Sequence, residues 1–497
     1  MAIGVGVAIL LFQFTGAAQD AGPDRGPNRS KTDDIAERIT GVAMTRGGAI
    51  AFLEKLTDTI GGRVTGSAQS RAAAELILQE LHAAGFENAH FEDFSMAAGW
   101  QRGPAAGWVV SPAKQNLYVG SYGWAPGTKG PVEAPLVAVM VSPDGKLASP
   151  DGKPDPARLR GAAVLAMLDT SSSANTFAAN YVVMRSRTAR QLASAGAVAM
   201  LIPSEKPDRM LYTSAAGFYP RAPVPVISIA KEDTLFLQRL LAKGEVRIGL
   251  DIQNAFDEEP AKERNVIADL PGSSPDNVVL IGAHFDSWDA AQGADDNGSG
   301  VAAVLEAARI LKSLNVKPKA TIRFVFFSGE EQACLGSRAY IERHREELDR
   351  LWAAFIMDNG ASAPTGFSLH GRDDLEMPLK RILADLRSIQ AGSIVNGGDL
   401  YSDDESFVVA GVPALSLEVA RSDYDDRHHT IIDTFDRVDP HALAMDAAAL
   451  ALASYYIASA QESPGRRLST EEVDSLLKRT GQFEYVELDF SAEERKH

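Results

Sequence analysis

The sequence predicts an α/β fold in which a mixed, largely parallel central sheet is sandwiched by helices. Segments 278–283 (VVLIGA), 322–327 (IRFVFF) and 353–357 (AAFIM) are almost entirely apolar, which is the pattern of strands that helices cover on both faces. Segment 299–311 places apolar residues at helical spacing and supplies one covering helix. The chain has 497 residues, 45% of them hydrophobic, which is enough for a large core and more than one domain.

Residues 1–18 have the composition of a secretory signal peptide. An uncharged apolar run at 3–14 is followed by small residues of the kind found at cleavage sites. We therefore expect a secreted or periplasmic protein whose mature chain begins near Gln19. Because no Lys or Arg precedes the apolar run, an N-terminal membrane anchor is the alternative. No later segment is expected to span a membrane.

Of the next two segments, we expect the first to be flexible and the second to be folded. Residues 19–34 are polar and rich in Gly, Pro and charge, which predicts a flexible leader. Folded structure is expected in residues 35–104. There, apolar residues between Ala73 and Ala84 recur at helical spacing and Gly85 ends the pattern, so we predict an amphipathic helix that packs on the sheet.

Residues 105–255 have a different sequence pattern, with short apolar runs separated by clusters of Gly, Pro and Ser. This predicts an inserted domain rich in strands. The first pattern resumes in residues 256–463, whose last helix is expected to start at an Asp439 N-cap followed by Pro440. Residues 464–497 read as a charged C-terminal tail that contains one short helix.

Charge and cysteine content exclude some classes of function and fold. The formal net charge is -17 and no block of Lys and Arg interrupts it, so the surface would repel nucleic acid. The single cysteine, Cys334, rules out an internal disulfide. We expect Cys334 to be a small buried residue and not a nucleophile.

Acidic and imidazole side chains follow each of the three predicted strands. His284 and Asp286 come after the first strand, Glu330 and Glu331 after the second, and Asp358 after the third. Because the carboxyl ends of parallel strands meet at one edge of a sheet, these side chains can converge. Two further segments, GADDNGSG (293–300) and RHHT (427–430), can join them from loops. Imidazole and carboxylate ligands without a thiolate suit zinc, and one carboxylate can bridge two ions.

Each cluster taken alone has a simpler interpretation. Asp295 and Asp296 are residue types common in turns, a Glu pair after a strand is usually a solvated loop, and a lone His is usually not a ligand. Five such clusters at strand ends or adjacent loops exceed what solvated turns supply, so together they favour a metal site.

The segments that carry these clusters resemble a known family in order and spacing. HFDSWDAAQGADDNGSG, FVFFSGEEQACLGSRAY, FIMDNGASAPTG, YSDDESFVVAGVPALSL and HHTIIDTFDRVDP are similar to the dizinc exopeptidases of the carboxypeptidase Q type, within a larger family that includes bacterial zinc aminopeptidases. The resemblance runs from about Phe52 to about residue 460. The insertion resembles a protease-associated domain.

The resemblance implies five zinc ligands. His284 and Asp358 would hold one ion, and Glu331 and His429 the other. Asp296 would bridge the two ions, because the bridging carboxylate of the family directly precedes the N-x-S-G segment.

The resemblance also implies roles for residues beside the ligands. Asp286 would fix the tautomer of the neighbouring imidazole, and Glu330 would be the general base. His428 occupies the position where several relatives place a Tyr and would donate a hydrogen bond to the oxyanion. Ser402 and Asp403 lie in a loop that the family places near the substrate, although a structural turn is an equal alternative.

The activity implied is hydrolysis of a peptide bond near a free terminus of short peptides or dipeptides, by a water that two zinc ions activate; a homodimer is also implied. An aminopeptidase of the same family is the main alternative. A glutaminyl-cyclase-like acyltransferase would use one zinc and normally lacks the insertion. A metal-free, receptor-like binding protein is disfavoured because no ligand position is lost.

Overall fold

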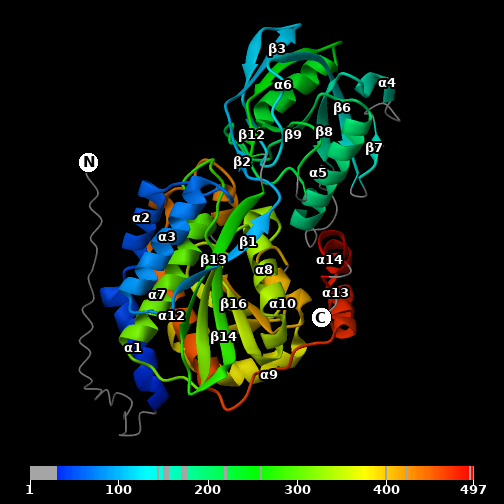
Figure 1. Ribbon diagram of the computed structural model, residues 1–497. Coiled ribbons are helices and arrows are strands. Elements are labelled where there is room, and N and C mark those ends of the chain that lie inside the picture. Colours follow the sequence, from blue (N-terminus) through cyan, green and yellow to red (C-terminus); the bar gives the residue numbers. More distant parts are fainter. Residues whose placement is uncertain are drawn as a thin grey trace, which may run out of the picture.

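The computed structural model describes residues 31–495 except 143–144, 149–155, 169–176, 218–220, 258–259, 398–399, 421–422 and 492–493. The expected signal peptide and the residues up to 30 lie outside this range. The first helix, α1 (Lys31–Arg46), begins slightly before the predicted end of the leader. The chain builds two bodies, each around its own sheet (Figure 1).

The larger body contains an eight-stranded sheet. In spatial order its strands are β1 (His90–Met96), β13 (Ala261–Leu270), β15 (Ala320–Phe327), β14 (Ser274–His284), β16 (Leu351–Ile356), β19 (Ala414–Val419), β17 (Pro364–Ser368) and β18 (Ser393–Val395). The central strands β15, β14, β16 and β19 pair in parallel, whereas β1, β13 and β17 make antiparallel pairs. Four strands therefore end at the same edge of the sheet.

Alternate residues of the central strands enter two different cores. In β14, Val279 and Ile281 pack on one side of the sheet, and Val278 and Leu280 on the other. The first core contains apolar side chains of α1, α2 (Ala49–Thr59), α3 (Ala68–Ala83), α7 (Ser299–Ser313), α9 (Asp373–Ile382) and α12 (Pro440–Ser459). The second contains those of α8 (Leu335–Arg343), α10 (Asp404–Val409), α13 (Thr470–Thr480) and α14 (Phe483–Asp489). The predicted mixed sheet between helices is confirmed.

Helix α12 is the one helix among the described residues that is long and apolar enough to cross a membrane. In its most apolar window, 78% of the residues are buried inside the fold. It begins as the sequence predicts, with the Asp439 side chain accepting a hydrogen bond from the His441 amide and Pro440 in the first turn. Its Ala-rich surface lets it pack closely on α7 and on the sheet.

The smaller body is built from residues 105–252, within the predicted insertion. Its sheet contains, in spatial order, β4 (Gln115–Leu117), β3 (Ala105–Ser111), β11 (Arg247–Ile252), β6 (Val132–Val141), β8 (Ala163–Leu168), β9 (Ala199–Pro203), β10 (Val226–Ile229) and β5 (Val119–Ser121), and β7 (Leu147–Ala148) pairs with β6. Its helices are α4 (Pro156–Leu159), α5 (Phe177–Ser194) and α6 (Lys231–Leu241). The chain leaves and returns through two short paired strands, β2 (Trp100–Gln101) and β12 (Ala255–Phe256).

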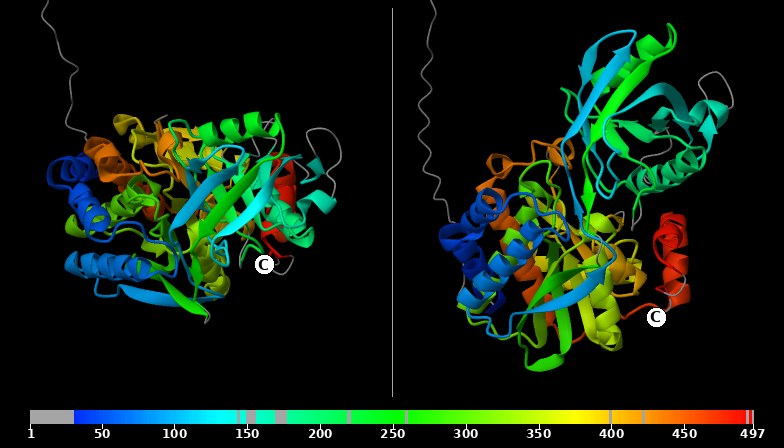
Figure 2. Two further views of the ribbon diagram at one scale, coloured as in Figure 1. Left: turned by 90° about the horizontal axis from the view of Figure 1, so that it is seen from above. Right: turned by 45° about the horizontal axis from the view of Figure 1, so that its top comes forward.

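The last segment differs from the charged tail that the sequence predicts. It forms α13 and α14, whose apolar side chains Val473, Leu476, Leu477 and Val486 are buried in the second core. Helix α13 starts with a capping box between Ser469 and Glu472. Charged residues between the apolar positions hide the helical pattern of α13 in the sequence. Figure 2 shows both helices, in red, lying alongside the larger body.

Candidate metal centre

The carboxyl edge of the parallel strands gathers every ligand that the sequence predicts. His284 is the last residue of β14, Asp358 follows β16 by two residues, and Glu331 lies in the short 3-10 helix Glu330–Gln332 after β15. His429 comes from the loop that follows β19. Asp296 lies in the turn Ala294–Gly298 that leads into α7.

His284 is the centre of the first cluster. Its Nε2 atom lies 3.1 Å from Asp358 Oδ1, 3.6 Å from Asp296 Oδ1 and 3.8 Å from Glu330 Oε2. The Nδ1 atom is 3.1 Å from the main-chain oxygen of Asp286. With the Nδ1 proton donated to that oxygen, the Nε2 lone pair faces the carboxylates, as metal binding requires.

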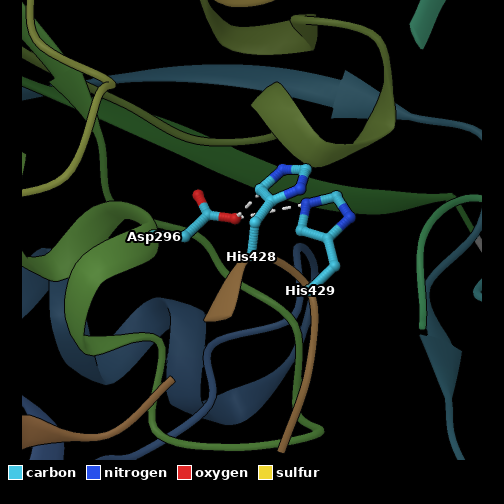
Figure 3. Close-up of side chains that lie close together, drawn as sticks. All are labelled: Asp296, His428 and His429. Carbon is cyan, nitrogen blue, oxygen red and sulfur yellow. Dashed lines mark ion pairs between the residues drawn. The ribbon is translucent and has the colours of Figure 1, made fainter. Parts of the chain in front are cut away.

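His429 is the centre of the second cluster (Figure 3). Its Nε2 atom lies 3.1 Å from Glu331 Oε2 and 3.2 Å from Asp296 Oδ2. The His428 ring stacks on that of His429 with centroids 3.8 Å apart, and His428 Nε2 is 3.7 Å from Asp296 Oδ2. The two carboxylate oxygens of Asp296 therefore face different imidazoles, one from each cluster.

Asp295 points away from both clusters. Its carboxylate forms an ion pair with Arg427 at 2.8 Å and accepts a hydrogen bond from the Ala361 amide, also at 2.8 Å. The preference for Asp296 as the bridging residue agrees with this orientation.

Asp286 lies behind the first cluster and contacts more than the neighbouring imidazole. Its carboxylate accepts a hydrogen bond from Thr65 Oγ1 at 2.7 Å and from the amides of Glu330 and Glu331, each at 3.3 Å. It is also 3.6 Å from His284 Nδ1. This buried carboxylate thus orients the strand end and the 3-10 helix that carries both glutamates.

Arg63 is a buried residue that the sequence reasoning missed. Its guanidinium donates to the main-chain oxygen of Phe285 at 2.6 Å, of Gly293 at 2.7 Å, of Gln292 at 2.8 Å and of Gly61 at 2.9 Å. It therefore joins the loop after His284 to the loop before Asp296. Burial lowers the pKa of Arg63 to about 10, so the group stays cationic at neutral pH. Its position within GGRVTG, inside the segment that resembles the family, is the only sequence signal of this role.

Replacing Arg63 by Met is expected to lower the free energy of unfolding by about 3 kcal/mol, because several buried carbonyl groups lose their donor. Denaturant unfolding of the metal-free protein measures this effect. Arg71→Met is the matched control, since Arg71 donates to the single carbonyl of Gly66 and should lose less than about 1 kcal/mol. Equal losses in the two variants would show that Arg63 does not hold the loops.

The two clusters hold more buried carboxyl groups than can be ionised together unless a cation is bound between them. Burial, with the charges of Asp358 and Glu331, raises the pKa of Glu330 well above its usual value. Burial raises the pKa of Glu331 to about 7. Burial opposes protonation of His284, but the nearby carboxylates of Asp358 and Glu330 raise its pKa well above the usual value. In the absence of a metal ion, protons bound to these carboxyl and imidazole groups therefore offset the negative charge of the clusters.

These residues fit zinc. They are imidazole and carboxylate groups, and two of their atoms, Glu331 Oε1 and His429 Nδ1, are buried without a hydrogen-bond partner in the described part of the chain. Two compact groups of potential ligands are present, one formed by His284, Glu330 and Asp358 and the other by Asp296, His428 and His429, so Glu330 and His428 lie among the potential ligands although the resemblance gives them other roles. A divalent cation in each would neutralise carboxylates that are costly to bury as anions.

Ser402 and Asp403 are buried at the start of α10. Burial raises the pKa of Asp403 to about 7, and the charge of His284 acts against that rise. Asp403 thus lies close enough to the first cluster to interact with His284, and the part of both residues in the reaction stays a prediction.

The chain is similar to known peptidases. A sequence profile of peptidase family M28 matches residues 265–454. Carboxypeptidase Q from Xenopus laevis is 30% identical over 371 residues, which cover 73% of this chain and 76% of the relative. A solved peptidase M28 precursor from Shewanella amazonensis has a TM-score of 0.78 at 28% identity, covering 88% of this chain and 99% of that chain. A zinc aminopeptidase from Bacillus subtilis shares the fold, with a TM-score of 0.61 and 20% identity over 84% of this chain and 97% of its own.

Proposed function

This chain belongs to peptidase family M28 and is a metallopeptidase, and we propose that it is a dizinc exopeptidase acting on short peptides or dipeptides. The proposed ligands are His284 and Asp358 for one zinc, Glu331 and His429 for the other, and Asp296 between them. The observation that carries the proposal is the orientation of Asp296, whose two oxygens lie 3.6 Å and 3.2 Å from the Nε2 atoms of different histidines.

When bound, the two zinc ions would supply Lewis acidity and lower the pKa of a coordinated water toward neutrality. Glu330 faces the first cluster, and the raised pKa of its carboxyl group suits a residue that takes a proton from water and returns it to the leaving amine. His428 lies beside the second cluster and its side chain is partly buried, with the exposed part open to a substrate, so its N–H can reach the oxygen of a bound substrate. Burial and the neighbouring His429 lower the pKa of His428, which favours a neutral donor.

A set of three substrates tests this activity: an unblocked dipeptide, its N-acetylated form and its C-amidated form. Zinc-dependent hydrolysis of the unblocked dipeptide is expected. Loss of hydrolysis on C-amidation identifies a carboxypeptidase or dipeptidase that reads the carboxylate, and loss on N-acetylation identifies an enzyme that reads the amine. Failure to cleave any peptide after zinc reconstitution would contradict the proposed function.

Export is the second part of the proposal, and the apolar run at 3–14 supports it. The mature protein is expected to begin near Gln19 and to be recovered outside the cytoplasm. N-terminal sequencing of protein from the exported fraction measures this. An intact Met1 on that protein would favour the membrane anchor instead.

A further inference from the structure

The inserted domain forms part of the wall around the proposed second zinc site. Its segment 204–213, between β9 and β10, lies against the loop that carries His429. The Thr213 amide donates to the main-chain oxygen of His429 at 3.0 Å. The Tyr212 ring lies 5.3 Å from the His429 ring and 6.1 Å from the His428 ring, centroid to centroid. We call segment 204–213 the inserted wall.

A second set of contacts fixes this wall to the catalytic body. Arg102, just before the insertion, forms an ion pair with Asp289 at 2.7 Å and donates to Thr213 Oγ1 at 3.0 Å. Trp288, in the loop after β14, packs edge-on to the His429 ring at 6.0 Å. The inserted wall is therefore held in place on both sides of the metal-ligand loop.

Lys206 extends from this wall over the helix that precedes the histidine pair. Its ammonium donates to the main-chain oxygen of Asp425, in the short helix α11 (Tyr424–Arg427). Asp425 is three residues before His428, so the ammonium lies within about one helical turn of the ligand loop.

The other cationic side chains around this loop are already paired. Arg427 binds Asp295 at 2.8 Å, Arg102 binds Asp289, and Arg209 binds Asp233 at 3.0 Å. No carboxylate of the described residues lies within ion-pair distance of Lys206, whose ammonium has three N–H donors. Lys206 therefore keeps donors and charge available for a ligand.

We propose that Lys206 binds the terminal carboxylate of the substrate and so selects peptides whose free carboxyl end lies next to the scissile bond. This role rests on the proposed peptidase function and specifies its substrate class. In such a substrate the carboxylate is one residue, about 3.5 Å, beyond the attacked carbonyl. A chain of net charge -17 with acidic ligands repels a free carboxylate, and the ammonium of Lys206, held at α11 beside the histidine pair, would offset that repulsion.

The test compares Lys206→Met, Lys206→Arg and Lys231→Met on the unblocked dipeptide and its C-amidated form. Lys206→Met is expected to raise KM for the unblocked dipeptide about tenfold, the effect of losing one charge-assisted hydrogen bond, with kcat little changed. The C-amidated form lacks the carboxylate that Lys206 would bind, so the wild type should hydrolyse it with a lower kcat/KM than the unblocked dipeptide, and Lys206→Met should not lower that value further. Lys206→Arg should restore most of the binding, and Lys231→Met, which removes the same charge elsewhere in the inserted domain, should behave as the wild type.

Three results would overturn the proposal. An equal loss on both substrates in Lys206→Met would mean that Lys206 only supports the wall, and the peptidase function would stand. If C-amidation leaves hydrolysis by the wild type unchanged and N-acetylation abolishes it, the enzyme recognises the free amine of the substrate and not its carboxylate. A wild-type protein inactive on every peptide would remove the proposed function itself, and the role of Lys206 with it.

Discussion

Glu330→Gln is expected to lower kcat about a hundredfold or more while the zinc content stays at two ions per chain. The amide keeps the shape of the side chain but cannot accept the proton of the attacking water, and general bases contribute on this scale. Glu330 Oε2 lies 3.8 Å from His284 Nε2, within the first cluster, and the family resemblance gives it no ligand role. Steady-state kinetics and elemental analysis of the same preparation measure both quantities.

Glu331→Gln is the matched control, because it makes the same chemical change one residue away. Glu331 Oε2 lies 3.1 Å from His429 Nε2, and a neutral amide is a poor zinc ligand. This variant should lose zinc from the second site together with activity. If Glu330→Gln loses zinc and Glu331→Gln keeps both ions, the two glutamates exchange roles. Near wild-type turnover in Glu330→Gln would contradict the mechanism.

Removing one metal ligand is the second change with a large expected effect. His284→Ala and His429→Ala should each retain about one zinc, because each leaves one cluster without its only imidazole ligand. Asp296→Ala should weaken both sites, since its two oxygens face both histidines. The kcat/KM of all three variants should fall by more than about a hundredfold. This loss exceeds the decrease that follows when a residue that only hydrogen-bonds to a metal ligand is replaced.

His344→Ala is the control for this series. His344 is bound to Glu92 at 3.0 Å and has no part in either cluster, so its variant should keep both ions and wild-type kcat/KM. If Asp296→Ala retains two zinc ions, Asp296 is not the bridging ligand.

The convergence of the candidate ligands could be predicted from sequence because it follows from the strands. Runs such as VVLIGA and IRFVFF identify strands buried on both faces, and parallel strands bring the residues after them to one edge. His284, Asp358 and the two glutamates are therefore close together although they are far apart in the sequence. The choice of Asp296 over Asp295 depended on the family resemblance, and the structure shows that the Asp295 carboxylate is turned toward Arg427.

Other parts of the site could not be predicted because they depend on packing between segments without a shared pattern. Arg63 acts through hydrogen bonds to main-chain oxygens. Every residue type has such an oxygen, so the sequence at those positions does not reveal the contacts. The contacts of Tyr212 with the His429 ring and of Lys206 with Asp425 depend on how the inserted domain lies on the larger body. In α13 the charged residues hid the apolar stripe formed by Val473 and Leu477.

Zinc stoichiometry is the most direct test of the dizinc site on which the proposed function depends. Wild-type protein purified without chelators, reconstituted with zinc and freed of excess metal, is analysed for metal per chain. The arrangement of His284, His429 and Asp296 predicts two zinc ions per chain. A reproducible value of one or fewer would contradict the dizinc site and with it the bridging role of Asp296.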